Sequence, residues 1–300
     1  MPDAPLRASR EVLVMLNVTR WILGIAFSTF WVTPAASVTV FGQYDGSMVV
    51  IDPLSIDLAG PGYAVKTDLA RGIFRSRAAA PAGRRTQNAY TGFHSPLALT
   101  NNGTVPLVFQ PGFIALHVHG TYALGTSADS QQSITSAGVL AATTAGVQSI
   151  ARADHTVSRV VLDNGALGGE ANIFKPTFES NGARVVATTA SMSEVEYELL
   201  MPRLVVDPGH VLALTVLLAP SASAFDNGAA AADFFNTATL TVRVPAGFAL
   251  EDLGTNAGVP LEFVSVVPLP ASAWFMAGIL VWLQRKRTPA HRRRRLGHST

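Results

Sequence analysis

Two histidines, His117 and His119, have the residue type and the spacing that a metal site on a β-strand would use. Alternate residues of a strand share a face, so both imidazoles could point the same way and coordinate zinc. Zinc usually takes three or four ligands, and no other His, Cys or carboxylate stands at a spacing typical of a zinc motif. The pattern also fits a half-buried strand with Ile114, Leu116 and Val118 inward. The sequence favours this second interpretation, with both histidines in solvent, and assigns no metal ligand.

Three glutamates, Glu194, Glu196 and Glu198, alternate with apolar residues in the same manner. Carboxylates on one strand face could bind Ca²⁺, which prefers oxygen ligands. Two carboxylates could also serve a glycosidase, but that chemistry needs both groups in one cleft, which a sequence does not reveal. We interpret the row as an acidic, solvated strand face.

Signatures of the common enzyme classes do not occur in the 300 residues. The chain has no cysteine, which excludes a thiol nucleophile, a disulfide scaffold and a Cys-type zinc site. It also contains no G-x-S-x-G elbow, no G-x-G-x-x-G loop and no P-loop, the usual fingerprints of serine hydrolases and nucleotide-binding enzymes. We therefore expect a non-enzymatic protein with no catalytic residues and no cofactor.

Charge is distributed unevenly along the chain. The formal net charge is +2, and charged residues make up only 14% of the sequence, against roughly 25% in an average soluble domain. Basic residues gather before position 38 and after position 284, whereas residues 38–270 contain twelve basic and eighteen acidic side chains, a net charge of −6. An acidic body argues against nucleic acid as a partner.

The N-terminal residues 1–37 have the pattern of a secretory signal peptide. Arg20 precedes the uncharged apolar run 21–32, and Ala35 and Ser37 supply the small residues that signal peptidase reads at positions −3 and −1. The run is shorter than the about 20 apolar residues that cross a membrane. We expect export by the Sec machinery and cleavage before Val38. A retained anchor or a buried helix is the alternative.

The C-terminal residues 263–300 have the pattern of a short membrane tail. No charge occurs from 263 to 284, and Pro270 predicts the start of a helix over 271–283, because proline is tolerated in the first turn of a helix but not in its interior. Such a helix is about 20 Å long, less than a hydrocarbon core of about 30 Å. A buried helix followed by a nucleic-acid-binding tail is the alternative.

Basic residues after this helix predict a cytoplasmic stop, which leaves the acidic body outside the membrane. They are Arg285, Lys286, Arg287, Arg292, Arg293, Arg294 and Arg295.

The residues Val267, Pro268, Leu269, Pro270 and Ala271, a short hydrophobic helix and a basic cluster follow one another in this tail. The order resembles the VPLPA variant of the PEP-CTERM sorting signal, with Leu269 in place of the glutamate of the parent motif. The resemblance is confined to residues 266–295. It implies export in a Gram-negative bacterium that makes extracellular polysaccharide, transient anchoring in the inner membrane, and recognition and removal of the tail by an exosortase.

Between these ends, residues 38–262 predict an all-β ectodomain. Several segments alternate apolar and polar residues with period two, which is typical of half-buried strands, and turn residues such as Asn-Gly separate them. About ten short strands indicate a β-sandwich with jelly-roll or immunoglobulin-like topology. The clearest strands are 38–41, 48–51, 105–109, 114–121, 157–162, 184–189, 194–199, 210–218 and 239–244.

Two stretches fit the strand pattern less well. Residues 127–153 are rich in Ala, Ser and Thr and show no clean period, so we interpret them as a small helix or a long surface loop. Residues 78–88 contain two adjacent arginines among small residues, and we interpret them as a flexible connection.

The expected function is that of an exported surface or matrix protein, processed by an exosortase and associated with extracellular polysaccharide. A carbohydrate-binding or carbohydrate-active sandwich and a permanently anchored membrane protein are the alternatives. All four tryptophans lie outside residues 38–262, which weakens the carbohydrate alternative because sugars commonly stack on aromatic platforms.

Overall fold

The computed structural model describes residues 40–44, 47–51, 55–60, 62–81, 86–88, 91–92, 97–255 and 259–263. Within these ranges the regular structure is β-strand, apart from two single-turn 3₁₀ helices, η1 (Leu69–Arg71) and η2 (Leu250–Asp252). The predicted all-β class is therefore confirmed.

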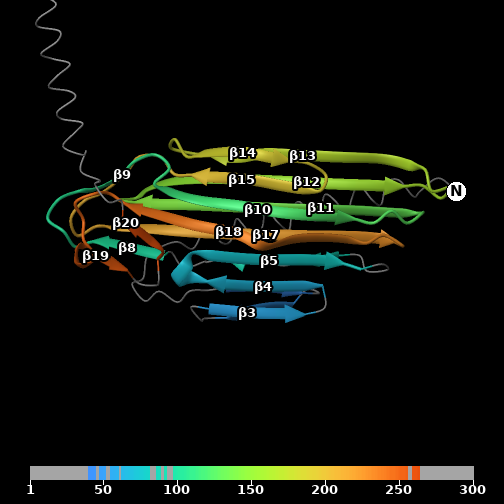
Figure 1. Ribbon diagram of the computed structural model, residues 1–300, viewed down its shortest axis with the longest axis horizontal. Helices are drawn as coiled ribbons and strands as arrows, with labels where there is room; N and C mark the ends of the chain where they lie inside the picture. Colours follow the sequence, from blue (N-terminus) through green and yellow to red (C-terminus); the bar gives the residue numbers. More distant parts are fainter. Residues whose placement is uncertain are drawn as a thin grey trace, which may run out of the picture. The chain divides into compact units, whose positions relative to one another are not determined.

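One large sheet, here called sheet I, has the strand order β14-β15-β10-β18-β5-β4-β3 (Figure 1). Its seven in-order strands pair antiparallel, and β20 adds to β18 in parallel. The strands are β14 (Arg184–Ala190), β15 (Glu194–Leu200), β10 (Ile114–Leu124), β18 (Ala230–Val244), β5 (Ile73–Ala80), β4 (Tyr63–Asp68), β3 (Ser55–Gly60) and β20 (Leu261–Phe263).

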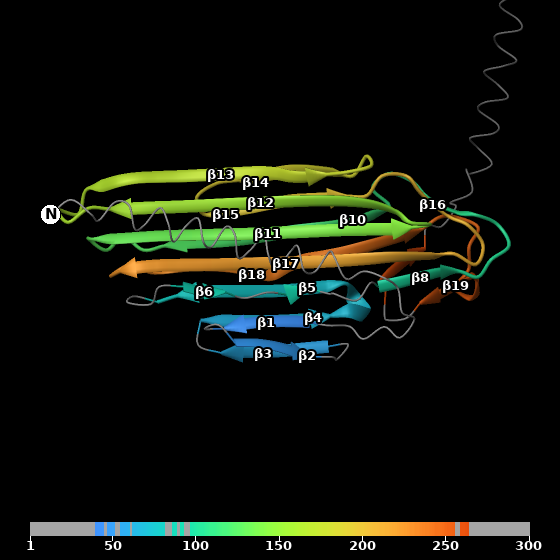
Figure 2. The same cartoon turned by 180° about the vertical axis from the view of Figure 1, so that it is seen from behind.

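The other large sheet, sheet II, has the order β13-β12-β11-β17-β8-β19 and faces the viewer in Figure 2. Two short strands, β6 and β7, also pair with β17. The strands are β13 (Leu167–Glu179), β12 (Val147–Val161), β11 (Ser130–Thr144), β17 (Val211–Asp226), β8 (Leu97–Asn101), β19 (Leu253–Thr255), β6 (Thr86–Asn88) and β7 (Thr91–Gly92). Two small ribbons complete the fold, β1 (Val40–Tyr44) with β2 (Ser47–Ile51), and β16 (Leu204–Val206) with β9 (Leu107–Phe109).

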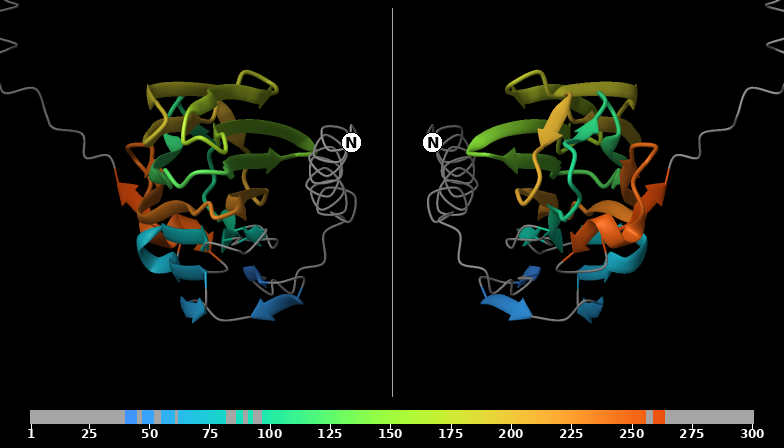
Figure 3. Two further views of the ribbon diagram at one scale, coloured as in Figure 1. Left: turned by 90° about the vertical axis from the view of Figure 1, so that its right-hand side faces the viewer. Right: turned by 90° about the vertical axis from the view of Figure 1, so that its left-hand side faces the viewer.

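A single main core joins the two sheets, because alternate side chains of each strand point inward. Phe74, Leu116 and Phe234 of sheet I and Ile134 and Leu214 of sheet II are all fully buried. Full burial of one large apolar side chain stabilises a fold by about 2 kcal/mol, so this core is the main source of stability. The sheets form the two layers that Figure 3 shows end-on.

Gly138 of β11 shows how closely the two layers approach. A Cβ atom at this position would lie 2.3 Å from the hydroxyl of Tyr197, which projects from β15 and is fully buried. A glycine is needed here for space and not for a special backbone angle, because any larger residue would displace the tyrosine ring.

The strands that the sequence predicted most clearly are confirmed, and most are longer than expected. The expected strand 210–218 is the first part of the sixteen-residue β17, and 114–121 is the first part of β10. Predicted turns also lie between strands: Asn181 and Gly182, which join β13 to β14, have φ of 52° and 79°, a left-handed conformation that Asn and Gly tolerate.

The interpretation of residues 127–153 as a helix or surface loop is wrong. Residues 127–129 precede the first strand, but residues 130–153 form β11 and the first half of β12, joined at Ala145 and Gly146. The positive φ angles of these two residues, 48° and 79°, are typical of a tight hairpin turn. The period was hidden because the inward face includes small or polar residues, such as Ser136 and Gly138. The outward face, conversely, carries Val139 and Ala141, which form a small second cluster with Ile150 of β12.

The interpretation of residues 78–88 as a flexible connection is also wrong in part. Residues 78–80 complete β5, and Thr86–Asn88 form β6, which pairs with β17. Residues 82–85 lie outside the described part of the chain.

Candidate functional site

The candidate site lies on the outward face of two neighbouring strands of sheet I, β10 and β15. The inward residues of β10, including Leu116 and Val118, are fully buried, and so is Leu199 of β15. Strand alternation therefore turns His117 and His119 outward on β10, and it does the same for the three glutamates of β15.

The register of the antiparallel pair brings the two predicted groups together. His119 lies directly opposite Glu196, and His117 lies directly opposite Glu198, while Glu194 faces Thr121 one step further along. Two histidines and three glutamates that the sequence treated separately thus share one surface, here called the His–Glu face. The solvated strand faces predicted from the alternation pattern are both part of it.

Imidazole and carboxylate groups are in contact across this face. His119 Nε2 lies 2.8 Å from Glu194 Oε1, a hydrogen-bonding distance. His117 Nε2 lies 3.4 Å from Glu196 Oε1, and His117 Nδ1 lies 3.9 Å from Glu198 Oε1. These side chains are between 31% and 47% exposed, so solvent and ions reach them.

Each imidazole pairs with carboxylates of its own in this arrangement. Among the residues that the structure describes, no group of three or more His, Asp or Glu side chains is already gathered around one point as a metal site requires. The face as it stands is a set of polar pairs on a solvated sheet.

A second polar group, which the sequence did not predict, is buried between the sheets. His155 of β12 is 1% exposed, and its Nδ1 lies 3.0 Å from the hydroxyl of Tyr122 on β10. That hydroxyl lies 2.7 Å from Ser136 Oγ on β11. On the other side of the ring, Nε2 lies 2.5 Å from Asn172 Oδ1 on β13, and Asn172 Nδ2 donates to the carbonyl of Ala190 on β14.

The donors in this chain of hydrogen bonds are fixed by the end at Asn172. Because Asn172 uses its amide group as a donor to Ala190, its oxygen must accept from His155 Nε2. In the neutral ring Nδ1 is then the acceptor, and it receives the Tyr122 proton, while Tyr122 accepts from Ser136. This series of hydrogen bonds starts in sheet II and enters sheet I at Tyr122. It then returns to sheet II and ends on sheet I.

Burial dominates the electrostatics of this group. It lowers the pKa of His155 below the ordinary value for histidine, because the charged ring loses its hydration, and the hydrogen bond to Asn172 opposes this shift only in part. Burial also raises the pKa of Tyr122 far above its ordinary value. Both side chains are therefore neutral at pH 7, and the group is a structural tie between the sheets with no access for a substrate.

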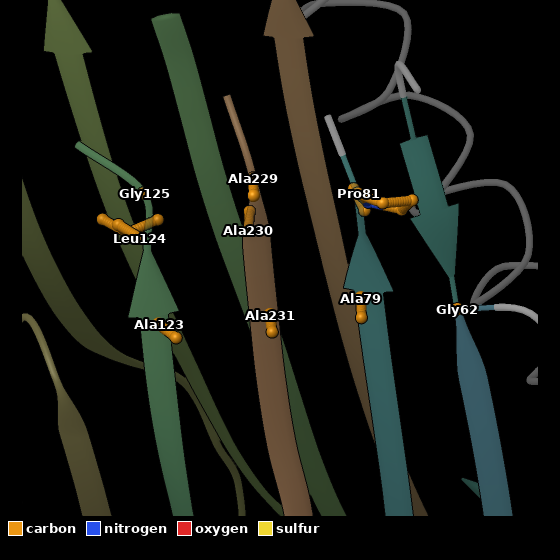
Figure 4. A pocket seen from close by; sticks show the side chains of 10 residues that line it. Gly62, Ala79, Pro81, Ala123, Leu124, Gly125, Ala229, Ala230 and Ala231 are labelled. Atoms are coloured by element: carbon orange, nitrogen blue, oxygen red, sulfur yellow. The ribbon is translucent and has the colours of Figure 1, made fainter. Parts of the chain in front are cut away.

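A shallow hollow of about 410 Å³ lies at one end of sheet I (Figure 4). Its lining is made of small or apolar residues and contains no titratable side chain, so it offers no group for catalysis. The lining residues are Gly62, Ala79, Ala80, Pro81, Ala123, Leu124, Gly125, Ala229, Ala230 and Ala231.

The residues predicted for export and sorting lie outside the described part of the chain. They are Ala35 and Ser37 of the cleavage site, the motif Val267, Pro268, Leu269, Pro270 and Ala271, and the basic residues 285–287 and 292–295. Within the described residues, no helix has the length and apolar character needed to span a bilayer.

Comparison with known proteins gives no match: no family model, no curated protein and no solved structure is similar to this chain.

Proposed function

We propose that the protein is a non-enzymatic, exported surface or matrix protein of a bacterium, sorted and cleaved by an exosortase at its C-terminal tail. The observation that carries the proposal is the order of three elements in one short stretch: the motif Val267–Ala271, an uncharged helix-forming segment and a basic cluster. Signal peptidase and the Sec machinery would act first, at Ala35 and Ser37, and would release a chain that begins at Val38.

The tail has the physical properties of a temporary tether. Its hydrophobic segment is short for a bilayer, so it holds the protein less firmly than a full membrane span, and the basic residues after it oppose translocation of the end. Pro268 and Pro270 keep the adjoining backbone extended, because a residue that precedes proline avoids the helical region. A protease can bind such an extended segment through strand-like contacts.

The body supports a role as cargo. We propose three parts, a signal peptide over 1–37, an ectodomain over 38–262 and a sorting tail over 263–300. Within the described part of the chain the strands run from Val40 to Phe263, so the last strand, β20, ends one residue beyond the proposed ectodomain. Sheets I and II support a β-sandwich ectodomain, and the repeated passage of the chain between them is in keeping with jelly-roll or immunoglobulin-like topology. The acidic body and its lack of tryptophan favour a matrix protein over a carbohydrate-active enzyme.

Deletion of the exosortase gene in the source organism tests this function. We expect a precursor that has lost its signal peptide but keeps its whole C-terminal tail. It should accumulate in the inner-membrane fraction, because the tail would remain as an anchor. A strain with the exosortase gene restored is the control and should again release the shortened protein. Equal release with and without the exosortase would contradict the proposal.

A further inference from the structure

We propose that β13 is an edge for self-association, at which β13 of a second copy of this chain adds in antiparallel orientation and joins two copies into one continuous sheet. The proposal rests on the folded sheets and does not depend on the sorting function. A second copy is the favoured partner because the free backbone groups along this strand form a self-complementary pattern.

Two edge strands lie at the same border of the sandwich, β13 of sheet II and β14 of sheet I (Figure 1). An edge strand has backbone N–H and C=O groups with no partner strand, and these can pair with another chain. In β14 such groups are partly occupied: the N–H of Val185 donates to Glu179 Oε1, and the carbonyl of Ala190 accepts from Asn172 Nδ2. Both covering side chains come from β13, so β13 protects β14 and its own edge stays open.

The pairing of β13 with β12 determines which of its backbone groups are free. One backbone hydrogen bond joins Leu162 to Ala166 at one end of this pair, and another joins Ser180 to Ile150 at the other end. Hydrogen-bonded and non-hydrogen-bonded positions alternate along an antiparallel pair, and one residue is skipped at each of the two register shifts. Counting from either end gives the same result. The residues whose N–H and C=O groups both point away from β12 in the regular part of the strand are Glu170, Asn172 and Phe174.

A proline and the two register shifts limit the usable edge. The shifts leave a regular stretch of β13 from Gly169 to Pro176. Pro176 occupies the next edge-facing position after Phe174, and because it has no N–H it cannot continue a full ladder of hydrogen bonds. The edge-facing residues that remain are spaced evenly about Asn172.

This spacing is self-complementary. When a second copy approaches in antiparallel orientation with Asn172 opposite Asn172, Glu170 of each copy lies opposite Phe174 of the other. Each opposing pair can then exchange two backbone hydrogen bonds. No two like charges face each other in this register, because Lys175 lies opposite Gly169. The two-fold symmetry closes the contact, so it produces a dimer and not a fibre.

Exposed apolar side chains gather at the same border. Among the described residues ten large apolar side chains are exposed, and five of them lie on β13, on β14 or in the turn that leads into β13. Clustering of this kind is typical of a surface that a partner covers. On β13 the exposed fractions are 57% for Leu167, 45% for Ile173 and 49% for Phe178. In the proposed register Ile173 lies opposite Ala171 of the second copy, so pairing would bury part of its side chain.

Sedimentation velocity of the purified protein over a range of concentrations tests the proposal. We expect a reversible dimer, and we expect Ile173→Lys to raise its dissociation constant by about tenfold or more, because the change removes apolar contact and brings positive charges together across the two-fold axis. Val211→Lys is the matched control, since Val211 is 44% exposed on β17, two strands away from β13 in sheet II. Both variants keep the apolar ends of the chain, so association through those ends would be the same in each.

Hydrogen exchange gives a second readout that also locates the contact. The amide protons of residues 170, 172 and 174 should exchange quickly in dilute wild-type protein and slowly in concentrated protein. In Ile173→Lys they should exchange quickly at both concentrations, while the unfolding temperature stays that of the dilute wild type, because Ile173 is on the solvent face. A chain that stays monomeric at every concentration would overturn the proposal. So would a dimer that Ile173→Lys weakens no more than Val211→Lys does.

Discussion

Replacement of both Pro268 and Pro270 by alanine is expected to stop maturation, so that nearly all of the protein stays as an uncleaved precursor in the inner membrane. Proline in a helix interior costs about 3 kcal/mol, because it removes a hydrogen bond and clashes with the preceding turn. With alanine, the best helix former, the helix that we propose after the motif could extend through it. The exosortase would then meet a helix in place of an extended segment.

Immunoblotting of membrane and extracellular fractions measures this effect directly. The control is Pro245→Ala, which removes a proline from the turn after β18, away from the sorting motif. This control should mature to the same extent as the wild type. Normal cleavage of the double variant would contradict the proposal that recognition requires an extended backbone at residues 267–271.

Replacement of His155 by alanine is expected to destabilise the folded body by about 3 to 5 kcal/mol. The change leaves a cavity between the sheets, and it removes the hydrogen-bond partner of the buried Tyr122 hydroxyl and of Asn172 Oδ1. Urea denaturation of the wild type and the variant measures the difference in free energy of unfolding. His210→Ala, at an exposed turn, should change it by no more than about 0.5 kcal/mol.

The same histidine makes stability depend on pH in a defined direction. Burial holds the pKa of His155 in the folded protein below its unfolded value of about 6.5, so only the unfolded chain gains a proton as the pH first falls below that value. The contribution of His155 to the free energy of unfolding is therefore constant above about pH 6.5 and decreases as the pH falls further. A His155→Gln variant should lose this part of the acid dependence. An unchanged pH profile would contradict the assignment of a neutral ring.

Sequence patterns predicted the His–Glu face only in its separate halves. Alternation with Leu116 and Val118 places His117 and His119 outward, and the same logic places Glu196 outward, because period two is a local property of a strand. That β10 and β15 are neighbours, with His119 opposite Glu196, depends on pairing between residues far apart in the chain. A shift of a strand's pairing register by one residue would turn each of its side chains to the opposite face of the sheet. Nothing local in either segment determines which strand becomes its partner.

The buried chain of hydrogen bonds was missed for a different reason. His155 stands in an ordinary polar stretch, and only its position in the alternation, in step with Ala153 and Val157, marks it as inward. Strand β11, which supplies Ser136, was itself not predicted, because small residues on both of its faces weaken the period. A sequence pattern identifies a strand when one face is apolar and the other is polar. In this hairpin the two faces differ little in hydrophobicity.

The intact mass of the protein recovered outside the inner membrane is the most direct test of export and of removal of the C-terminal tail. We expect a single species whose N-terminus is Val38 and whose C-terminus lies before the basic residues Arg292–Arg295. A recovered protein that still carries Arg292–Arg295 would contradict it, because both the sorting and the release depend on removal of that end.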